Sequence, residues 1–121
     1  MLAVYLATVL SVLDGDTFKA RVPVWQGVEV VTDVRISGID APELKGKCDY
    51  EKVKAKEATA AMTYILTSAK SVTLQNVKDD KYSGRVVADV LVDGKPLASE
   101  MVSTGLVRSY NGKKRLGWCG E

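Results

Sequence analysis

Residues 2–37 read LAVYLATVLSVLDGDTFKARVPVWQGVEVVTDVRIS, and two turn signals divide this stretch into three runs rich in β-branched and aliphatic residues. The Asp-Gly-Asp of 14–16 ends the first run, 2–13, and a Gln-Gly pair ends the second, 17–25. Runs bounded by Gly and Asp in this way are typical of strands that tight turns connect. The stretch therefore predicts a three-strand meander, with 2–13 as a buried strand and 28–37 as the third strand.

The rest of the chain predicts two helices and two further strands. Residues 51–69 carry apolar side chains near one face at helical spacing, namely Val53, Ala58, Met62, Ile65, Leu66 and Ala69. Residues 71–77 and 85–92 have the composition of strands, and an Asp-Gly pair after the second predicts a tight turn. Residues 97–104 predict a short helix, which Gly105 ends in the position expected of a C-cap.

The order of elements is three strands, a helix, two strands and a helix, without βαβ alternation, internal repeats or low-complexity segments. At 121 residues the chain has the commonest size of one domain, so we expect residues 1–121 to form a single domain. The order suits a mainly β, α+β fold, a five-stranded barrel of the oligonucleotide-binding (OB) type with one long and one short helix. We expect the long helix to lie across one end of the barrel.

Composition and charge narrow the chemistry. Apolar residues make up 46% and charged residues 26% of the chain, close to the average of soluble globular proteins, which excludes a disordered chain. The net charge of +2 is too small to attract nucleic acid over the whole surface. The chain has no histidine, which removes the commonest general base, the commonest zinc ligand and the His-containing catalytic triads. Acid–base chemistry must then fall to carboxylates.

Two cysteines, Cys48 and Cys119, are too few for a zinc site without histidine, and their spacing is not that of a redox Cys-x-x-Cys motif. Two alternatives remain: a disulfide that pins the C-terminal tail to the loop carrying Cys48, or two free thiols.

The apolar run 2–13 is shorter than the roughly 18 residues that cross a bilayer, so we expect no membrane partner. The compartment stays open; a secreted or periplasmic location is expected only if an N-terminal signal has been removed and the cysteines pair.

Carboxylates and arginines gather in three short clusters. They are Asp14-Gly15-Asp16-Thr17, Arg35 with Ile39-Asp40-Ala41-Pro42-Glu43, and Lys81-Tyr82-Ser83-Gly84-Arg85. Hydrolysis of a phosphodiester needs an activated water and neutralised phosphoryl oxygens, and carboxylates that hold a divalent cation can serve both needs. Arginine suits phosphate because it donates two parallel hydrogen bonds and stays charged. An Asp-Gly turn alone is more simply a hairpin turn, but the three clusters together favour a phosphodiesterase site.

In this combination and order the clusters resemble those of the staphylococcal nuclease (thermonuclease) family, over about residues 4–110. The resemblance implies a bound calcium ion, an attacking water and a phosphate held by two arginines. The residues it implies are catalytic Arg35, Glu43 and Arg85; calcium-binding Asp16, Asp40 and Ala41, the last through its main-chain carbonyl; and substrate-binding Lys81, Tyr82 and Tyr110. Asp14 corresponds to a family aspartate that supports the ion through water.

Two positions depart from the family pattern. Ala41 stands where threonine is usual, so a backbone ligand is kept and a hydroxyl is lost. Ser83 is inserted between Tyr82 and Gly84, an insertion that a bulge before Arg85 can absorb. We expect these departures to act on metal affinity, on rate or on the placement of the substrate contacts.

The C-terminal segment leaves two pairs of interpretations open. Tyr110 either contacts a base or a phosphate, or is a partly buried core tyrosine. The basic run Lys113-Lys114-Arg115, with Lys45, Lys47 and Lys81, either follows a nucleic-acid backbone beyond the scissile phosphate or is solvated surface.

The resemblance implies a calcium-dependent endonuclease, a phosphodiesterase that hydrolyses accessible or single-stranded DNA and RNA and leaves 3′-phosphate ends. Because the candidate groups address phosphate and no base-reading motif is evident, little sequence preference follows. The alternative is a noncatalytic nuclease-like OB module that binds nucleic acid or protein, although such modules typically lack several of the carboxylates and arginines kept here. A purely structural barrel would leave the converging polar residues without a purpose. We expect the protein to be a monomer.

Overall fold

The computed structural model describes residues 3–80 and 84–120, and these ranges build the mixed α+β fold that the sequence predicts. In chain order the elements are β1 (Val4–Leu6), β2 (Thr8–Asp14), β3 (Thr17–Trp25), β4 (Val28–Ile36), β5 (Ile39–Asp40), α1 (Asp49–Ser68), β6 (Val72–Asp79), β7 (Arg85–Val92), β8 (Lys95–Pro96), α2 (Leu97–Ser103) and β9 (Arg108–Ser109). The sequence does not predict β5, β8 and β9, because two residues are too few to leave a composition signal.

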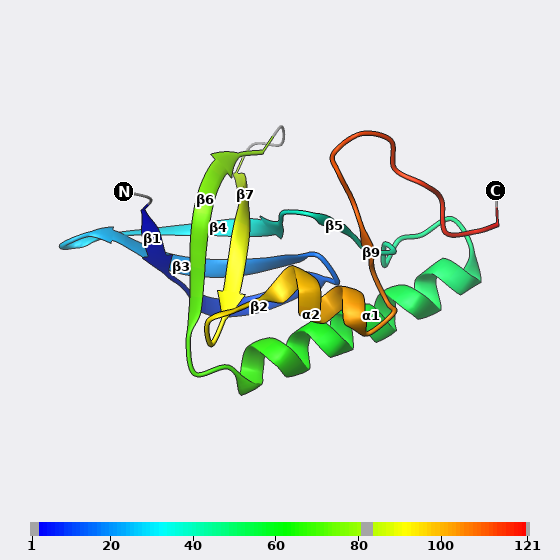
Figure 1. Ribbon diagram of the computed structural model, residues 1–121, viewed down its shortest axis with the longest axis horizontal. Helices are drawn as coiled ribbons and strands as arrows, with labels where there is room; N and C mark the ends of the chain where they lie inside the picture. The colour runs from blue at the N-terminus through cyan, green and yellow to red at the C-terminus, as the bar shows by residue number, and fades with distance from the viewer. Residues whose placement is uncertain (1–2, 81–83, 121) are drawn as a thin grey trace.

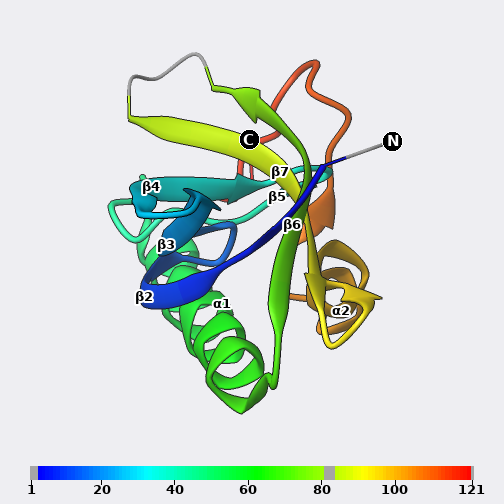
Figure 2. The same ribbon diagram turned by 90° about the vertical axis from the view of Figure 1, so that its left-hand side faces the viewer.

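The sheet closes through β1 and β2, which are two halves of one bent strand separated by the single residue Ala7. The order of paired strands is β1-β6-β7-β4-β3-β2, so the bent strand stands at both ends of that order. Figure 1 shows β6 and β7 crossing the β2–β3–β4 layer, and Figure 2 shows the bent strand running from the side of β6 to the side of β3. Counted once, it gives five main strands, with β4 and β7 paired in parallel, and the OB-type barrel is confirmed.

The prediction of one buried strand over residues 2–13 is wrong in two respects. The strand is interrupted at Ala7, where the chain passes from one partner to the other and donates its N–H to the Val72 carbonyl at 2.9 Å. Its side chains are also half exposed, with Val4 at 55% and Leu6 at 58%. A strand in a barrel wall turns only alternate side chains inward, so an apolar run does not require that both faces be covered.

The long helix α1 packs against β2 and runs along the lower side of the barrel in Figure 1. Its buried residues form one stripe of Glu51, Ala55, Ala58, Met62 and Leu66. The predicted apolar face included Val53, which is instead 53% exposed. The stripe begins at a charged residue because the Glu51 carboxylate accepts two main-chain N–H groups there, which a period of apolar residues does not reveal.

The turn and cap predictions at the end of the barrel are confirmed. Asp93 and Gly94 have φ values of 51° and 82° and form the tight turn between β7 and β8. Gly105 has a φ of 78° after α2 and donates its N–H to the Val102 carbonyl at 3.0 Å. Positive φ favours glycine and, to a lesser extent, aspartate, so these residue types mark the turns. Within the described ranges neither helix has the length and hydropathy needed to cross a membrane.

Candidate active site

The turn between β2 and β3 carries the first carboxylates of the site. Asp16 donates its main-chain N–H to Asp14 Oδ1 at 2.9 Å, which fixes the turn. Gly15 lets the turn approach α1, because a Cβ there would lie 2.7 Å from the Cβ of Ala58 and 3.0 Å from that of Ala41. A larger residue would therefore push Asp16 away from the segment that carries the second carboxylate.

The Asp16 side chain is 6% exposed, and each of its carboxylate oxygens has a partner. Oδ1 accepts a hydrogen bond from the Thr17 hydroxyl at 2.8 Å, and Oδ2 accepts one from the Ala41 N–H at 3.1 Å. The second bond joins positions 25 apart in the sequence. It brings Asp16 beside the main chain of Ala41, the two being predicted ligands of one ion.

Arg35 links the two predicted carboxylate ligands. It stands on β4 opposite Thr17 of β3, which aims it at the β2–β3 turn. Its Nη1 lies 3.0 Å from Asp16 Oδ2, and its Nη2 lies 4.0 Å from Asp40 Oδ1. Nη2 also donates to the Ile39 carbonyl at 3.4 Å. Only 16% of the arginine side chain is exposed, so the ion pairs are partly shielded from water.

Asp40 is 1% exposed, and its two oxygens have different surroundings. It lies in β5, opposite Arg108 of β9. Its Oδ1 forms an ion pair with Arg115 Nη2 at 2.7 Å, whereas Oδ2 forms none, and neither oxygen accepts a hydrogen bond from the residues that the structure describes. A buried carboxylate oxygen without a partner is unfavourable in a folded protein, so Oδ2 is a candidate ligand atom.

Asp14 and Asp16 differ in protonation although they are neighbours. Burial, with the hydrogen bond and the charge of Asp16, raises the pKa of Asp14 to about 7. Burial also acts to raise the pKa of Asp16, but the hydrogen bond from Asp14 and the charge of Arg35 outweigh it. Together with the donors on Thr17 and Ala41, they lower the pKa of Asp16. Asp14 is therefore partly protonated near neutral pH while Asp16 stays ionised.

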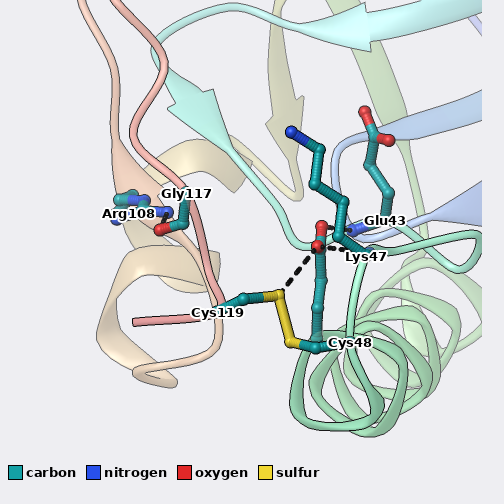
Figure 3. The surroundings of a disulfide bond; sticks show 7 residues. Glu43, Lys47, Cys48, Arg108, Gly117 and Cys119 are labelled. Atoms are coloured by element: carbon teal, nitrogen blue, oxygen red, sulfur yellow. Dashed lines mark hydrogen bonds between the residues drawn. A yellow bond between two sulfur atoms is a disulfide. The ribbon is translucent and has the colours of Figure 1, made fainter. Parts of the chain in front are cut away.

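Glu43 is held through its main chain while its side chain stays 54% exposed. Its N–H donates to Glu51 Oε2 at 3.0 Å, and the Lys47 N–H donates to Glu51 Oε1 at 3.1 Å. The Cys119 sulfur, which has no hydrogen to donate, lies 3.7 Å from the same Oε1, and Figure 3 shows these contacts beside the disulfide. The Glu43 N–H bond, helped by Lys47 and opposed by burial, lowers the pKa of Glu51.

Glu51 is a site residue that the sequence reading missed. It fixes the loop that carries Glu43, although it looks like any acidic residue in the first turn of a helix. Gly46 is the second part of the signal, because a Cβ there would lie 2.5 Å from Glu51 Cγ. A glycine in a loop followed five positions later by a helical glutamate is too common a pattern to predict this contact.

Arg35 and Arg85 face the same side of the sheet. They stand on the parallel neighbours β4 and β7, where Asp33 lies opposite Arg85 and Arg35 lies opposite Val87. Residues two apart on a strand share a face, so both guanidinium groups project to one side. Both arginines line a cleft of about 490 Å³.

Tyr110 lines the same cleft and lies outside the buried core cluster. Arg35 stands over its ring, 6.0 Å from the centroid. The Tyr110 N–H donates to the Gly38 carbonyl at 2.8 Å, and the Tyr110 hydroxyl donates to the Lys113 carbonyl at 3.1 Å. Tyr110 therefore lines the cleft and is not part of the buried core, and its contact with a base or a phosphate stays a prediction.

The segment before Arg85 is described only in part. Arg85 donates from Nε to Asp80 Oδ2 across the base of this segment. The predicted substrate contacts Lys81 and Tyr82, and the inserted Ser83, lie outside the described residues and stay predictions.

The C-terminal tail is fastened to the barrel by a covalent bond and by one arginine. A disulfide joins Cys48 to Cys119. Arg108 Nη2 donates to the carbonyls of Leu116 and Gly117 at 2.9 and 2.8 Å, and Figure 3 shows the second of these contacts. The Arg108 guanidinium also lies 3.7 Å from the centroid of the Trp118 ring. The alternative of two free thiols does not describe this structure.

Arg115 reaches from this tail into the site. Its Nη2 lies 2.7 Å from Asp40 Oδ1, and its Nη1 donates to Glu43 Oε1 at 3.2 Å. Although 46% of the Arg115 side chain is exposed, its guanidinium pairs with two acids, so solvated surface alone does not describe this residue of the basic run. No sequence signal could have found the contact, because it joins positions 72 apart and depends on how the tail folds back.

The donors around Asp40 suit a hard cation. Within the described ranges no three or more acidic or cysteine side chains gather as a ligand group. The predicted set needs only the carboxylates of Asp16 and Asp40 with the carbonyl of Ala41, and the unpartnered Asp40 Oδ2 is an oxygen ligand of the kind calcium prefers. Oxygen donors of this kind suit calcium, whose binding here stays a prediction, and Arg35 and Arg115 are the cations that pair with these carboxylates in the structure.

Most of the chain is similar to one known protein family. A family model described as "Staphylococcal nuclease homologue" matches residues 33–116. The matched region includes Arg35, Asp40, Glu43 and Arg85, and it begins after the turn that holds Asp16. No curated protein matches the chain.

Proposed function

This chain belongs to the staphylococcal nuclease homologue family, and we propose from that premise that it is a calcium-dependent endonuclease that hydrolyses phosphodiester bonds. One observation carries the proposal. The Arg35 guanidinium lies 3.0 Å from Asp16 and 4.0 Å from Asp40, at a cleft that Arg85 also lines. Two arginines at one cleft can bind a phosphate, and the two carboxylates that Arg35 pairs with can bind a cation beside it, which together meet the needs of phosphodiester hydrolysis.

In the proposed site Asp16, Asp40 and the main-chain carbonyl of Ala41 hold calcium. A bound calcium ion polarises phosphoryl oxygens and lowers the pKa of a water that it binds. Two observations support this assignment: Asp40 Oδ2 has no partner among the described residues, and the lowered pKa of Asp16 keeps its carboxylate ionised, as a cation ligand must be.

Arg35 and Arg85 bind the phosphate. A guanidinium can donate two parallel hydrogen bonds to phosphate oxygens and stays charged throughout the working pH range. Carboxylates support both groups: Asp16 lies 3.0 Å from Arg35, and Asp80 accepts a hydrogen bond from Arg85. Charged donors held in place before the substrate arrives need little reorganisation when charge grows in the transition state.

Glu43 orients the attacking water or takes its proton. Its main chain is fixed by Glu51, and its half-exposed carboxylate accepts a hydrogen bond from Arg115 that it exchanges for the water when it acts. A carboxylate is the natural candidate for a general base near neutral pH, because the chain has no histidine.

The proposed substrates are single-stranded or otherwise accessible DNA and RNA, cut with little sequence preference to leave 3′-phosphate ends. The proposed groups address phosphate and not base edges, which favours broad substrate use. The 3′-phosphate ends are an expectation that comes from the family alone.

The test is cleavage of single-stranded DNA by the native chain in calcium and in chelator, beside an Asp40→Asn variant. We expect calcium-dependent cutting that the variant loses, because the neutral amide removes one charged ligand atom. Glu29→Gln serves as the matched control, since Glu29 is an exposed acid beside the β3–β4 turn, at the opposite end of β4 from Arg35. A native chain that binds the strand without cutting it would favour the noncatalytic binding module instead.

A further inference from the structure

We propose that Arg115 sets the affinity of the site for its divalent cation, because it already occupies Asp40 and Glu43. The Cys48–Cys119 disulfide holds it in that position. The inference rests on the cation site of the proposed function and adds to it a residue from the tail, which no motif in the sequence connects with the ion.

The guanidinium of Arg115 bridges two acidic residues of the site. Its Nη2 lies 2.7 Å from Asp40 Oδ1, and its Nη1 lies 3.2 Å from Glu43 Oε1. The Asp40 side chain is 2% exposed, so water competes little for that ion pair, whereas the Glu43 side chain is 54% exposed. Asp40 is therefore the stronger partner, and it is the residue that the cation also needs.

The tail clamps Arg115 on both sides along the chain. Immediately after Arg115, the carbonyls of Leu116 and Gly117 accept hydrogen bonds from Arg108. Cys119, four positions after Arg115, is bonded to Cys48. Two positions before Arg115, the Lys113 carbonyl accepts the Tyr110 hydroxyl at 3.1 Å. A side chain anchored in this way reaches the carboxylates at a smaller entropic cost than one on a free tail.

A calcium ion at Asp40 must share that carboxylate with Arg115 or displace it. The unpartnered Oδ2 gives the ion an oxygen to bind, and the guanidinium on Oδ1 repels the ion at short range. Removing the guanidinium therefore strengthens calcium binding. A lysine keeps the charge without the forked contact to two acids, so it should have a smaller effect.

The experiment measures calcium binding by isothermal titration calorimetry of the full chain without nucleic acid. We expect Arg115→Ala and Arg115→Gln to tighten the dissociation constant about tenfold, the size of one charge-assisted contact, and Arg115→Lys to change it less. Lys113→Ala is the matched control, because it removes one charge from the same tail and its exposed side chain makes no contact with Asp40 or Glu43. It should leave the dissociation constant within about twofold of the native value.

The outcomes separate this inference from the function on which it rests. Native chain and Arg115 variants that bind calcium equally, or variants that bind it more weakly, would overturn the role of Arg115 and leave the cation site standing. No calcium binding by any of the chains would overturn both. Circular dichroism and thermal unfolding without calcium show whether each variant keeps its fold, and the Gln variant, which keeps most of the side chain, guards against a collapsed tail in the Ala variant.

A double-mutant cycle tests the part that the disulfide plays. Replacing both cysteines by serine should tighten calcium binding in the native background, because the freed tail withdraws Arg115 for part of the time. The same replacement in an Arg115→Ala background should have no further effect. An equal gain in both backgrounds, or none in either, would show that the disulfide does not act through Arg115.

Discussion

The barrel and the tail bring residues to one site by different means. Arg35 stands on β4, which pairs with β3. Both strands have nine residues, and the hydrogen bonds between them fix the register of Arg35 at many positions. Arg115 stands on a tail that depends on one disulfide and the contacts of Arg108. The comparison teaches that Arg35 should keep its place after most single substitutions in the barrel. Arg115 should lose its place when the disulfide alone is removed.

The largest effect we expect comes from the barrel side. Arg35→Ala removes a phosphate-binding charge and should lower kcat on single-stranded DNA by about 10³–10⁵, the range that arginines supply in phosphoryl transfer. The fold should persist, because the Asp16 carboxylate keeps its hydrogen bonds from Thr17 and Ala41. Single-turnover kinetics and circular dichroism check the two halves of this expectation.

The matched control for that change is Arg21→Ala, an exposed arginine on β3. It removes the same charge from the neighbouring strand and should change kcat by less than about threefold, since exposed charges more than a Debye length from a site are screened. Comparable losses in both variants would mean that Arg35 acts only through the overall field of the protein.

The second effect tests the tail. Serine at both Cys48 and Cys119 should lower the free energy of unfolding by about 4 kcal/mol, because the cross-link closes a loop of 71 positions in the unfolded chain. Urea unfolding of the native protein with and without reductant should show the same difference. A loss below about 1 kcal/mol would mean that the unfolded chain is already compact around these positions.

The third effect lies where the two regions meet, at Glu51. Glu51→Gln turns one acceptor of a main-chain N–H into a donor, which should lower the free energy of unfolding by about 2 kcal/mol at pH 7. The pKa of Glu51 is lowered on folding, so its carboxylate stabilises the protein above its usual pKa of 4.5, and this contribution is lost as the pH falls through the lower, folded value. The difference between native and variant should therefore shrink below pH 4.5.

A control on the same helix sharpens that result. Glu57→Gln removes an exposed acid of α1 that pairs with Lys54 at 3.3 Å, and it should change stability by no more than about 0.5 kcal/mol. A Glu51→Gln variant as stable as this control at pH 7 would contradict the role given to the two N–H bonds.

The smallest effect tests how closely the first turn approaches the helix. Gly15→Ala should lower the free energy of unfolding by about 1–2 kcal/mol, because the new Cβ would meet that of Ala58 at 2.7 Å. The double variant with Ala58→Gly should be more stable than the sum of the two single losses of free energy of unfolding predicts, because the clash is then relieved. Strictly additive losses in thermal unfolding would show that the turn relaxes without meeting the helix.

The barrel and the clusters of carboxylates and arginines could be predicted because their signals are local. The Asp-Gly turns, the apolar runs and the spacing of Arg35 and Glu43 are each written within a few residues. Strand pairing then brings Arg35 and Arg85 to one face, which follows from the two-residue period of a strand.

The rest of the site could not be predicted because it depends on contacts between distant positions. Arg115 meets Asp40 only after the tail folds back, and Glu51 binds the Glu43 loop only because Gly46 leaves room for it. The bend at Ala7 escaped notice for a related reason: an alanine within an apolar run looks like its neighbours, and only the two pairing partners reveal its place.

That bend also bears on how the protein behaves in a crowded solution. An open five-stranded sheet would offer a row of unpaired N–H and C=O groups at each of its two borders, and such rows recruit strands from other molecules. By turning at Ala7, one segment covers the borders of both β3 and β6. The few residues before the bend thus act against the growth of sheets between molecules. A chain shortened past β1 would leave the edge of β6 unpaired and open to pairing with a strand of another molecule.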